Sequence, residues 1–442
     1  MKKNLLICLV AISAFISISN AQDVNYRRSS LHTILLESDN FPKKDIVINA
    51  YNSYPFPDKY NEHFKDDASG QNTAAKSFDP KKIAITDADR SAAGQKTSGA
   101  SKFAKGMASQ ATGGLVDSTA KDIPLQINKY INESQLAKQM VKKWYNVKSD
   151  GGIDFELLKK RGCYSVSEAT KESLKKTSGG TLEDLMAKDT GLISNTFVVF
   201  NKLNFIENEP VVRAIRDAAK IAATAKITQP MLLEKALQAA DLAYEKGKEG
   251  YSVWTTSWLY KLAWSDKLSD YVKRIHDLPT EKERLNAWDT ATVFKLVLVG
   301  SEKSQSLVTF SLKEKRTEEQ IIKLALTRNI DNVYSKLQKE YDVFKPIIRV
   351  DNVGPITAKI GLKDGLTKKS KFELLNLEGT EFKKVGTISV DSKFPIWDNR
   401  FGADKEQKID SLNGKPIVTP EWTTFKGGKK AEKGFTYMRL KK

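Results

Sequence analysis

Residues Ile193 to Phe205 read ISNTFVVFNKLNF, and they give the strongest indication of the fold. The odd-numbered positions of this stretch are mostly large and apolar over about a dozen residues. A period of two is typical of a strand that turns one face towards a core. The stretch therefore predicts a long strand near the middle of the chain.

Two alanine-rich helices are expected directly after this strand. Each has Pro near its start and a capping candidate just before it, Asn208 for the first and Thr228 for the second. Gly247 and Gly250 end the second helix. The elements predicted from here on are helices at 210–225 and 230–246, a strand at 251–264, a helix at 268–275, and a strand pair at 292–299 and 306–312.

The longest helix is predicted to begin at Thr317, with Gln320 completing a capping box, and to end before Pro346. An apolar stripe at helical spacing marks its buried face. The stripe consists of Ile322, Leu326, Ile330, Val333, Leu337, Tyr341 and Phe344.

Towards the N-terminus, a strand is predicted at 31–36 and a helix at 45–54, which the punctuation Pro55-Phe56-Pro57 ends. Residues 66–121 are rich in Ala, Ser, Thr, Gly, Lys and Asp, with few large apolar side chains. Such a segment buries too little to offset its ordering entropy, so we expect a flexible insert, with at most a weak helix at 103–107.

Regular structure is expected to resume at Asn132, which would cap a helix with Gln135 at its third position. One face of this helix carries Leu136, Met140 and Trp144. After Gly151-Gly152, further short helices are predicted at 155–160, 168–176 and 181–188.

Beyond residue 346 the helical period disappears. Apolar and polar residues alternate at 356–360, 371–377 and 385–390, and Asp364-Gly365 marks a turn. The sequence thus predicts an α+β or α/β core domain with a long flexible insert, followed by a small all-β, barrel-like C-terminal domain. The predicted boundaries are 22–65 and 122–345 for the core, 66–121 for the insert and 346–442 for the β domain.

The first 21 residues have the three parts of a secretory signal peptide. Lys2 and Lys3 precede an apolar run from Leu5 to Ile18, which is short for a membrane span. Ser19 and Ala21 are the small residues that favour cleavage before Gln22. Cys8 lies inside the apolar run with no cleavage site before it, so it is not interpreted as a lipidation site.

The 442 residues carry 72 Lys and Arg against 54 Asp and Glu. Loss of Lys2 and Lys3 with the signal leaves 70 basic side chains and a charge of +16. Outside the cytoplasm this excess favours anionic envelope surfaces or acidic proteins over nucleic acid. Cys163 is then the one cysteine left, so no disulfide can form within the chain. We expect Cys163 to be a small buried residue, and a disulfide between two chains is the alternative.

Several stretches resemble a group of uncharacterised exported envelope proteins of Gram-negative bacteria, which implies an envelope location and no assigned chemistry. The stretches are NAYNSYPFPDKYNEH (49–63), LAKQMVKKWYN (136–146), KRGCYSVSEA (160–169), ISNTFVVFNK (193–202), AKIGLKDGLTKKSKFELL (358–375) and IWDNRFGAD (396–404). The helix order before the strand at 193–205 is similar to the α/β domain of curli-secretion-channel-type proteins, but the lipidated cysteine and membrane hairpins of those proteins are missing. The turn at 360–366 is similar to the small C-terminal β-barrel of flagellar assembly protein T.

No motif for catalysis, a cofactor or a metal survives inspection, so no site residue is assigned. His32, His63 and His276 are not spaced as a ligand pair and are expected to be core or surface residues. The calcium-like pattern that starts at Asp87 and Asp89 lacks the Gly and the final acid of such a loop. The glycine spacing at 94–99 lacks the Lys of a phosphate-binding loop, and neither a nucleophile elbow nor a dinucleotide fingerprint occurs.

Trp254, Trp258, Tyr260 and Trp264 share one face of the predicted strand at 251–264. Exposed, they could stack sugar rings; buried, they would pack against the alanine-rich helices, and we expect the buried arrangement. The loop Trp397-Asp398-Asn399-Arg400 is expected to be a turn held by its polar side chains. The basic segment 426–442 is expected to be a solvated face, with an anionic partner surface as the alternative.

The sequence thus favours a non-catalytic, exported envelope protein that binds a partner or helps assembly, in the periplasm or peripheral to the outer membrane. A carbohydrate-active hydrolase or a glycan-binding protein that uses Trp254, Trp258 and Trp264 is the alternative. Whether the chain is an enzyme stays open, with a non-enzyme favoured.

Overall fold

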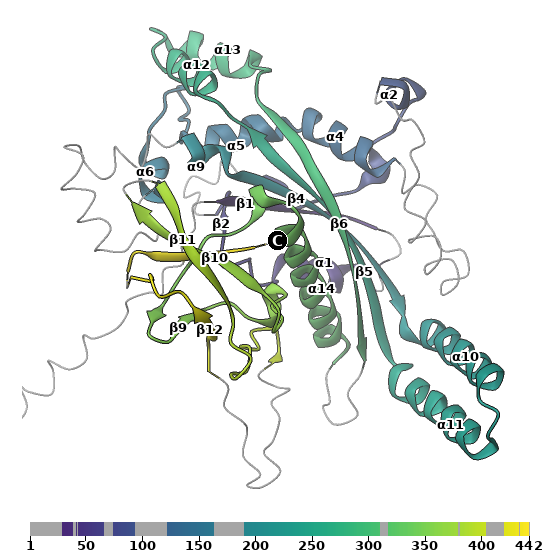
Figure 1. Cartoon of the computed structure of the whole chain (residues 1–442). Coiled ribbons are helices and arrows are strands. Elements are labelled where there is room, and N and C mark those ends of the chain that lie inside the picture. The colour runs from purple at the N-terminus through teal and green to yellow at the C-terminus, as the bar shows by residue number, and fades with distance from the viewer. Residues whose placement is uncertain are drawn as a thin grey trace, which may run out of the picture.

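The computed structural model describes residues 29–38, 41, 43–65, 74–92, 122–162, 190–309, 317–378, 381–403, 420–432 and 434–441. Over these residues the protein is a mixed α/β structure with two sheets (Figure 1). The signal segment, Cys163, the glycine pattern at 94–99 and the helices predicted at 103–107, 168–176 and 181–188 lie outside the described residues. No helix in the described ranges is both long enough and apolar enough to cross a membrane.

The first sheet has the order β2-β1-β4-β5-β6, and β3 also pairs with β1. Strands β2, β3 and β4 run parallel to β1, whereas the β4–β5 and β5–β6 pairs are antiparallel. The strands are β1 (Ser30–Leu36), β2 (Asn61–Glu62), β3 (Ser77–Phe78), β4 (Thr196–Glu207), β5 (Gly250–Ala263) and β6 (Lys295–Thr309).

The long strands predicted at 193–205 and 251–264 are confirmed as β4 and β5. The strand pair predicted at 292–299 and 306–312 is wrong, because β6 is one continuous strand as far as the structure describes it. It pairs with β5 along its whole length, from Lys295 opposite Ala263 to Thr309 opposite Gly250. Gly300 therefore lies within a strand, beside a register shift, and not in a turn.

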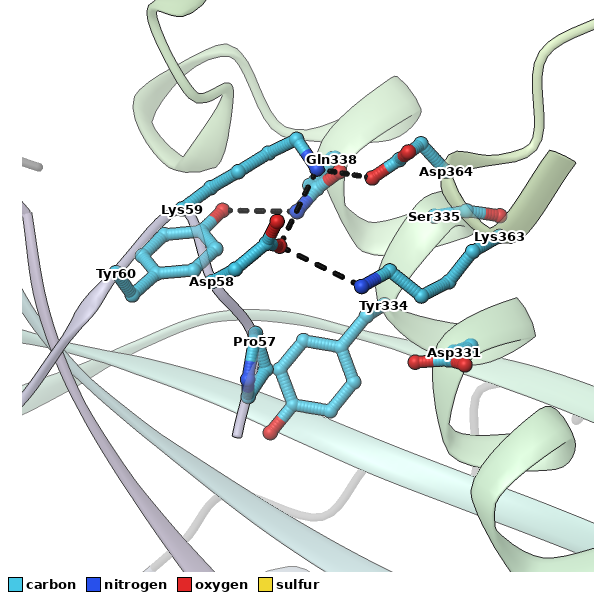
Figure 2. Close-up of a pocket in the computed structure, with 10 residues that line it drawn as sticks. All are labelled: Pro57, Asp58, Lys59, Tyr60, Asp331, Tyr334, Ser335, Gln338, Lys363 and Asp364. Atoms are coloured by element: carbon cyan, nitrogen blue, oxygen red, sulfur yellow. Dashed lines mark hydrogen bonds and ion pairs between the residues drawn. The ribbon is translucent and has the colours of Figure 1, made fainter. Parts of the chain in front are cut away.

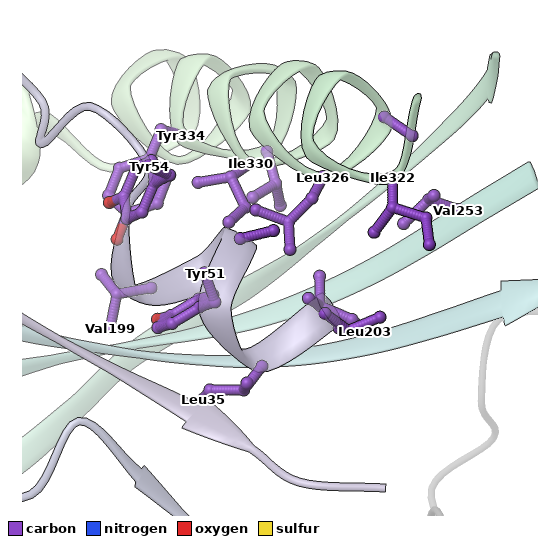
Figure 3. Packing of buried hydrophobic residues seen from close by; sticks show 14 of the residues in the cluster. Leu35, Tyr51, Tyr54, Val199, Leu203, Val253, Ile322, Leu326, Ile330 and Tyr334 are labelled. Atoms are coloured by element: carbon purple, nitrogen blue, oxygen red, sulfur yellow. The ribbon is translucent and has the colours of Figure 1, made fainter. Parts of the chain in front are cut away.

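Helices cover both faces of this sheet. Helix α1 (Lys44–Asn52) and helix α14 (Glu318–Glu340) cover one face, where Tyr51, Leu203 and Leu326 meet in one core (Figure 3). Helix α4 (Ile123–Glu133) and helix α5 (Leu136–Trp144) cover the other face.

Strand β4 lies between these two layers. The one-faced burial predicted for it is wrong in its first half, where four consecutive apolar residues are fully buried. A central strand with helices on both sides has no solvent face, so alternation along it is lost. The four residues are Phe197, Val198, Val199 and Phe200.

Helix α14 begins as predicted. Thr317 and Gln320 form the capping box, and the stripe from Ile322 to Leu337 is buried. The helix ends at Glu340, before the predicted stop at Pro346, and a 3-10 turn, η3 (Asp342–Phe344), follows it. Phe344 is still buried, because this turn folds it back onto the core.

The predicted helix with Leu136, Met140 and Trp144 on one face is confirmed as α5, where all three are buried, but it begins at Leu136 and not after Asn132, and a separate helix that was not predicted precedes it. Helix α4 begins at Ile123, and its apolar residues at a spacing of four pack against the sheet. The chain then turns at Gln135, whose φ of 52° is left-handed, and no side-chain cap forms there. The apolar stripe of α4, and not the capping pattern, therefore sets where the helices begin.

Part of the predicted flexible insert has regular structure. Of residues 66–121, the structure describes 74–92, which form β3, the turn η1 (Pro80–Lys82) and helix α2 (Asp87–Ala92). Strand β3 pairs with β1, and Phe78 stacks on Tyr130 of α4 at 4.2 Å between ring centroids. These contacts order a stretch for which the composition indicated flexibility.

Shorter helices pack around a third cluster, whose largest members are Trp144 and Trp288. Two of them, α9 and α13, were not predicted, although Thr280 and Glu283 form a capping box at the start of α13. The helices are α6 (Glu156–Gly162), α9 (Thr190–Ser194), α12 (Asp266–His276) and α13 (Glu281–Thr290).

The second sheet has the order β7-β13-β10-β11-β12-β9-β8, and all its pairs are antiparallel. The strands predicted at 371–377 and 385–390 are confirmed as β10 and β11, and a turn, η4 (Leu362–Asp364), precedes them. The strands are β7 (Ile348–Arg349), β8 (Asn352–Val353), β9 (Ile356–Ala358), β10 (Lys371–Glu378), β11 (Glu381–Val390), β12 (Thr423–Gly427) and β13 (Thr436–Leu440).

Candidate functional site

His32 and His63 are core residues whose rings both pack against Phe64, whereas His276 is exposed at the end of α12. His32 bonds the carbonyl of Ala75 at 3.1 Å, and burial lowers the pKa of His32 to about 4. Arg161 can only donate to Nδ1 of His63, so His63 carries its proton on Nε2, which donates to Met140 O at 2.9 Å. Burial and the Arg161 charge keep the pKa of His63 well below its usual value, so this ring stays neutral.

No group of three or more possible metal ligands occurs among the residues that the structure describes. Asp87 and Asp89, the acids of the calcium-like pattern, serve helix α2 instead. Asp89 accepts hydrogen bonds from the backbone and hydroxyl of Thr86, both at 2.8 Å, and Asp87 pairs with Arg90 at 2.7 Å. These contacts are local to the start of the helix.

Trp258, Tyr260 and Trp264 on the aromatic face of β5 pack against other elements, but not against the expected helices. Trp258 is 9% exposed, and it lies with Tyr260 in the core under α4 and α5. Trp264 is half-buried and stacks on Phe294, and Trp254 is half-buried. The expectation that the alanine-rich helices would cover these rings is wrong, because those helices point away from the sheet (Figure 1).

A buried ionic cluster joins separate segments of the chain (Figure 2). Its centre is Asp364 of η4, whose side chain is 7% exposed. Asp364 accepts hydrogen bonds from Lys59 Nζ at 2.5 Å, from the Gly361 amide at 2.8 Å and from Asn399 Nδ2 at 3.0 Å. The segment after α1, the η4 turn and the loop at 397–400 therefore meet at one carboxylate.

The charges in this cluster are paired. Burial alone would raise the pKa of Asp58, but Lys59 and Lys363 outweigh it and lower the pKa of Asp58 to about 2. Burial also opposes the charge on Lys59, yet Asp364 and Asp58 raise the pKa of Lys59 above its usual value. Asp58 and Lys59 therefore stay ionised at neutral pH.

Asp331 of α14 is the exception. It lines the same hollow, and within the described part of the chain no hydrogen bond or ion pair to its carboxylate is found. Burial raises the pKa of Asp331 to about 7, and Asp364 and Asp58 add to the rise while Lys363 and Lys59 oppose it. This carboxyl group therefore exchanges its proton near neutral pH.

The hollow lies where α14 of the first sheet's layer meets the loops of the second sheet, a region called the joint below. The hollow is open to solvent, and its volume of about 320 Å³ includes part of that solvent. Around it, Lys339 of α14 donates to Gly365 O at 2.7 Å, and Arg328 donates to Phe401 O at 3.0 Å. These contacts tie α14 to the loops of the second sheet.

The predicted turn at 397–400 forms part of this joint. Asp398 pairs with Arg400 at 2.6 Å, and Asn399 Oδ1 accepts from the Lys363 amide at 2.8 Å. Three of the stretches that carry the resemblance, at 49–63, 358–375 and 396–404, thus meet at one place. Sequence inspection did not connect them, because the first lies far from the other two along the chain.

Among the described residues, the four most exposed large apolar side chains lie on a helical hairpin, called the arm below. It consists of α10 (Asn208–Lys226) and α11 (Pro230–Gly247), which connect the end of β4 to the start of β5 and project away from both sheets (Figure 1). The exposed fractions of its large apolar side chains are 58% for Ile215, 72% for Ile221, 71% for Met231, 51% for Leu232 and 56% for Leu242.

The arm is fixed at its base. Asn208 accepts from Ser252 Oγ at 2.8 Å and donates to Glu249 O at 3.1 Å, and Tyr244 donates to Glu209 at 2.8 Å. The N-terminal capping predicted for Asn208 and Thr228 does not occur, since neither helix has a side-chain cap. The positions of both helices were predictable, but their exposure was not.

The basic segment 426–442 lies partly in β12 and β13. Lys426, Lys429 and Lys430 are exposed, whereas Arg439 pairs with Glu373 at 2.8 Å.

Comparisons of the chain with family models, with curated proteins and with solved structures found no match.

Proposed function

We propose that this chain is a non-catalytic protein of the cell envelope that binds a partner or helps assembly. The observation that carries the proposal is the arm, where five large apolar side chains are more than half exposed. Monomeric proteins seldom expose such surfaces without an interaction to make. The signal-like first 21 residues support export to the periplasm, or to a place peripheral to the outer membrane.

The partner proposed is an envelope protein or an anionic envelope surface, and not nucleic acid. The resemblance to exported envelope proteins supports the location, and the net charge supports attraction to anionic groups. The carbohydrate alternative loses its main support, since Trp258 is buried and Trp264 is packed against Phe294. We also propose that residues 346–442 are a separate barrel-like domain, supported by a core cluster drawn only from that range.

Photo-crosslinking in intact cells tests the proposed function. A photo-reactive residue at Leu232 on the arm should give adducts, and the same residue at Lys267, which is exposed on α12, should give none. Adducts at neither position, from protein shown to be exported and folded, would contradict a binding function for the arm.

A further inference from the structure

Two of the five exposed large apolar side chains of the arm, Ile215 and Leu232, lie with alanines on one side of it, whereas the helical spacing places Ile221, Met231 and Leu242 off that face. On α10, Ile215 is followed by Ala218, Ala222 and Ala225 at a spacing of three and four. Residues at this spacing share one face of a helix. All four are exposed.

Helix α11 repeats the arrangement with Leu232, Ala236, Ala239 and Ala243, of which only Ala236 is half-buried. Polar contacts fix how the helices face each other: Lys220 pairs with Asp241 at 2.6 Å, and Arg216 lies over the Tyr244 ring at 4.5 Å. These contacts set the rotation of each helix about its own axis. Because the helices are antiparallel, both apolar faces then lie on the same side of the arm.

The size of this surface suits a specific interface. With a rise of about 1.5 Å per residue and a diameter of about 10 Å, two helices of this length present about 500 Å². Pairing two such surfaces buries about 1,000 Å² in total, which is close to the minimum expected of a specific protein interface.

The charge of the arm favours another copy of the arm over an anionic surface. Residues 208–247 carry six basic and five acidic side chains, whereas the whole chain has a net charge of +18. A nearly neutral arm does not repel a second arm, and it offers little excess positive charge to select anionic lipid or polyanion.

We propose that the arm docks face to face with the arm of a second copy of this chain. The inference rests on the proposed binding function and names its partner. A two-fold axis through the interface would bring the same surface of both copies together. The large side chains of this face, Ile215 and Leu232, would then contact the alanines of the other copy. The alanines let the helices approach closely.

Sedimentation equilibrium of the full chain, isolated from the exporting cell, tests the pairing. The unaltered chain should sediment with twice the mass of one chain. Ala222→Glu combined with Ala239→Glu should give the mass of one chain, whereas the control pair Thr224→Glu and Gln238→Glu, on the other side of the arm, should stay dimeric. All the altered residues are exposed, so melting curves should coincide.

An unaltered chain that sediments as one chain over the whole concentration range would overturn the pairing, and so would equal masses for the two double variants. If adducts at Leu232 in cells then contain a different protein, the binding function stands and only the choice of partner fails. If no adducts form either, both proposals fail.

Discussion

Replacing Trp258 with Ala separates a buried core strand from a sugar-binding surface. An indole side chain covers about 200 Å², and Trp258 is 9% exposed, so about 180 Å² is removed from water. At about 25 cal/mol per Å² this burial stabilises the protein by about 4.5 kcal/mol. The methyl group of Ala keeps part of that, while the cavity under α4 and α5 adds to the loss, so we expect a destabilisation of about 4 kcal/mol.

Urea denaturation monitored by circular dichroism measures this loss. The midpoint should fall with an unchanged slope, because the surface exposed on unfolding stays almost the same. Trp422→Ala is the matched control, since Trp422 is 45% exposed and its loss should change the midpoint little. Equal midpoints for the wild type and Trp258→Ala, together with loss of retention on a glycan column, would refute the burial argument and favour carbohydrate recognition.

The joint and the N-terminus carry the other predictions. Gly361→Ala should destabilise the protein by about 1–3 kcal/mol, because the added Cβ would clash with Trp397 O. Gly386→Ala is the control, since its added Cβ would lie 3.9 Å from the nearest atom, on Leu374, and should cost little. Urea denaturation measures the stability of both variants. Between pH 4 and about 7 the native Asp331 carboxyl binds its proton more tightly than the unfolded one, so the contribution of Asp331 to stability should fall as pH rises. The stability of Asp331→Asn relative to the wild type should therefore increase over this range, and parallel stability–pH curves would contradict the assignment. N-terminal sequencing of the exported protein should begin at Gln22, and a retained Met1 would rule out cleavage.

The sequence predicted those elements whose position depends on residues close together in the chain. The two long strands and the capped start of α14 follow from periodicity and from Thr317 with Gln320. What lies against each face depends on contacts between distant residues, so the helices that cover Trp258 could not be assigned. Composition also misjudged residues 74–92, where β3 pairs with β1.

The candidate site shows the same limit. The charges at Lys59 and Asp364 are 305 residues apart, and nothing near either one in sequence indicates their ion pair. The arm was predicted as two helices, yet alanine-rich helices are equally consistent with a core element. Its exposure follows from the β4–β5 pairing, which leaves the hairpin beyond the end of the sheet.

Deletion of the arm is the sharpest test of the proposal that it binds a partner. Glu207 lies opposite Tyr251 in the β4–β5 ladder, so removal of residues 209–249 leaves Asn208-Gly250 as a two-residue turn of the type that joins antiparallel strands. Chemical crosslinking in intact cells should then capture adducts with the full chain and none with the shortened chain, while both chains stay folded by circular dichroism. The same adducts from both chains would contradict the assignment of binding to the arm.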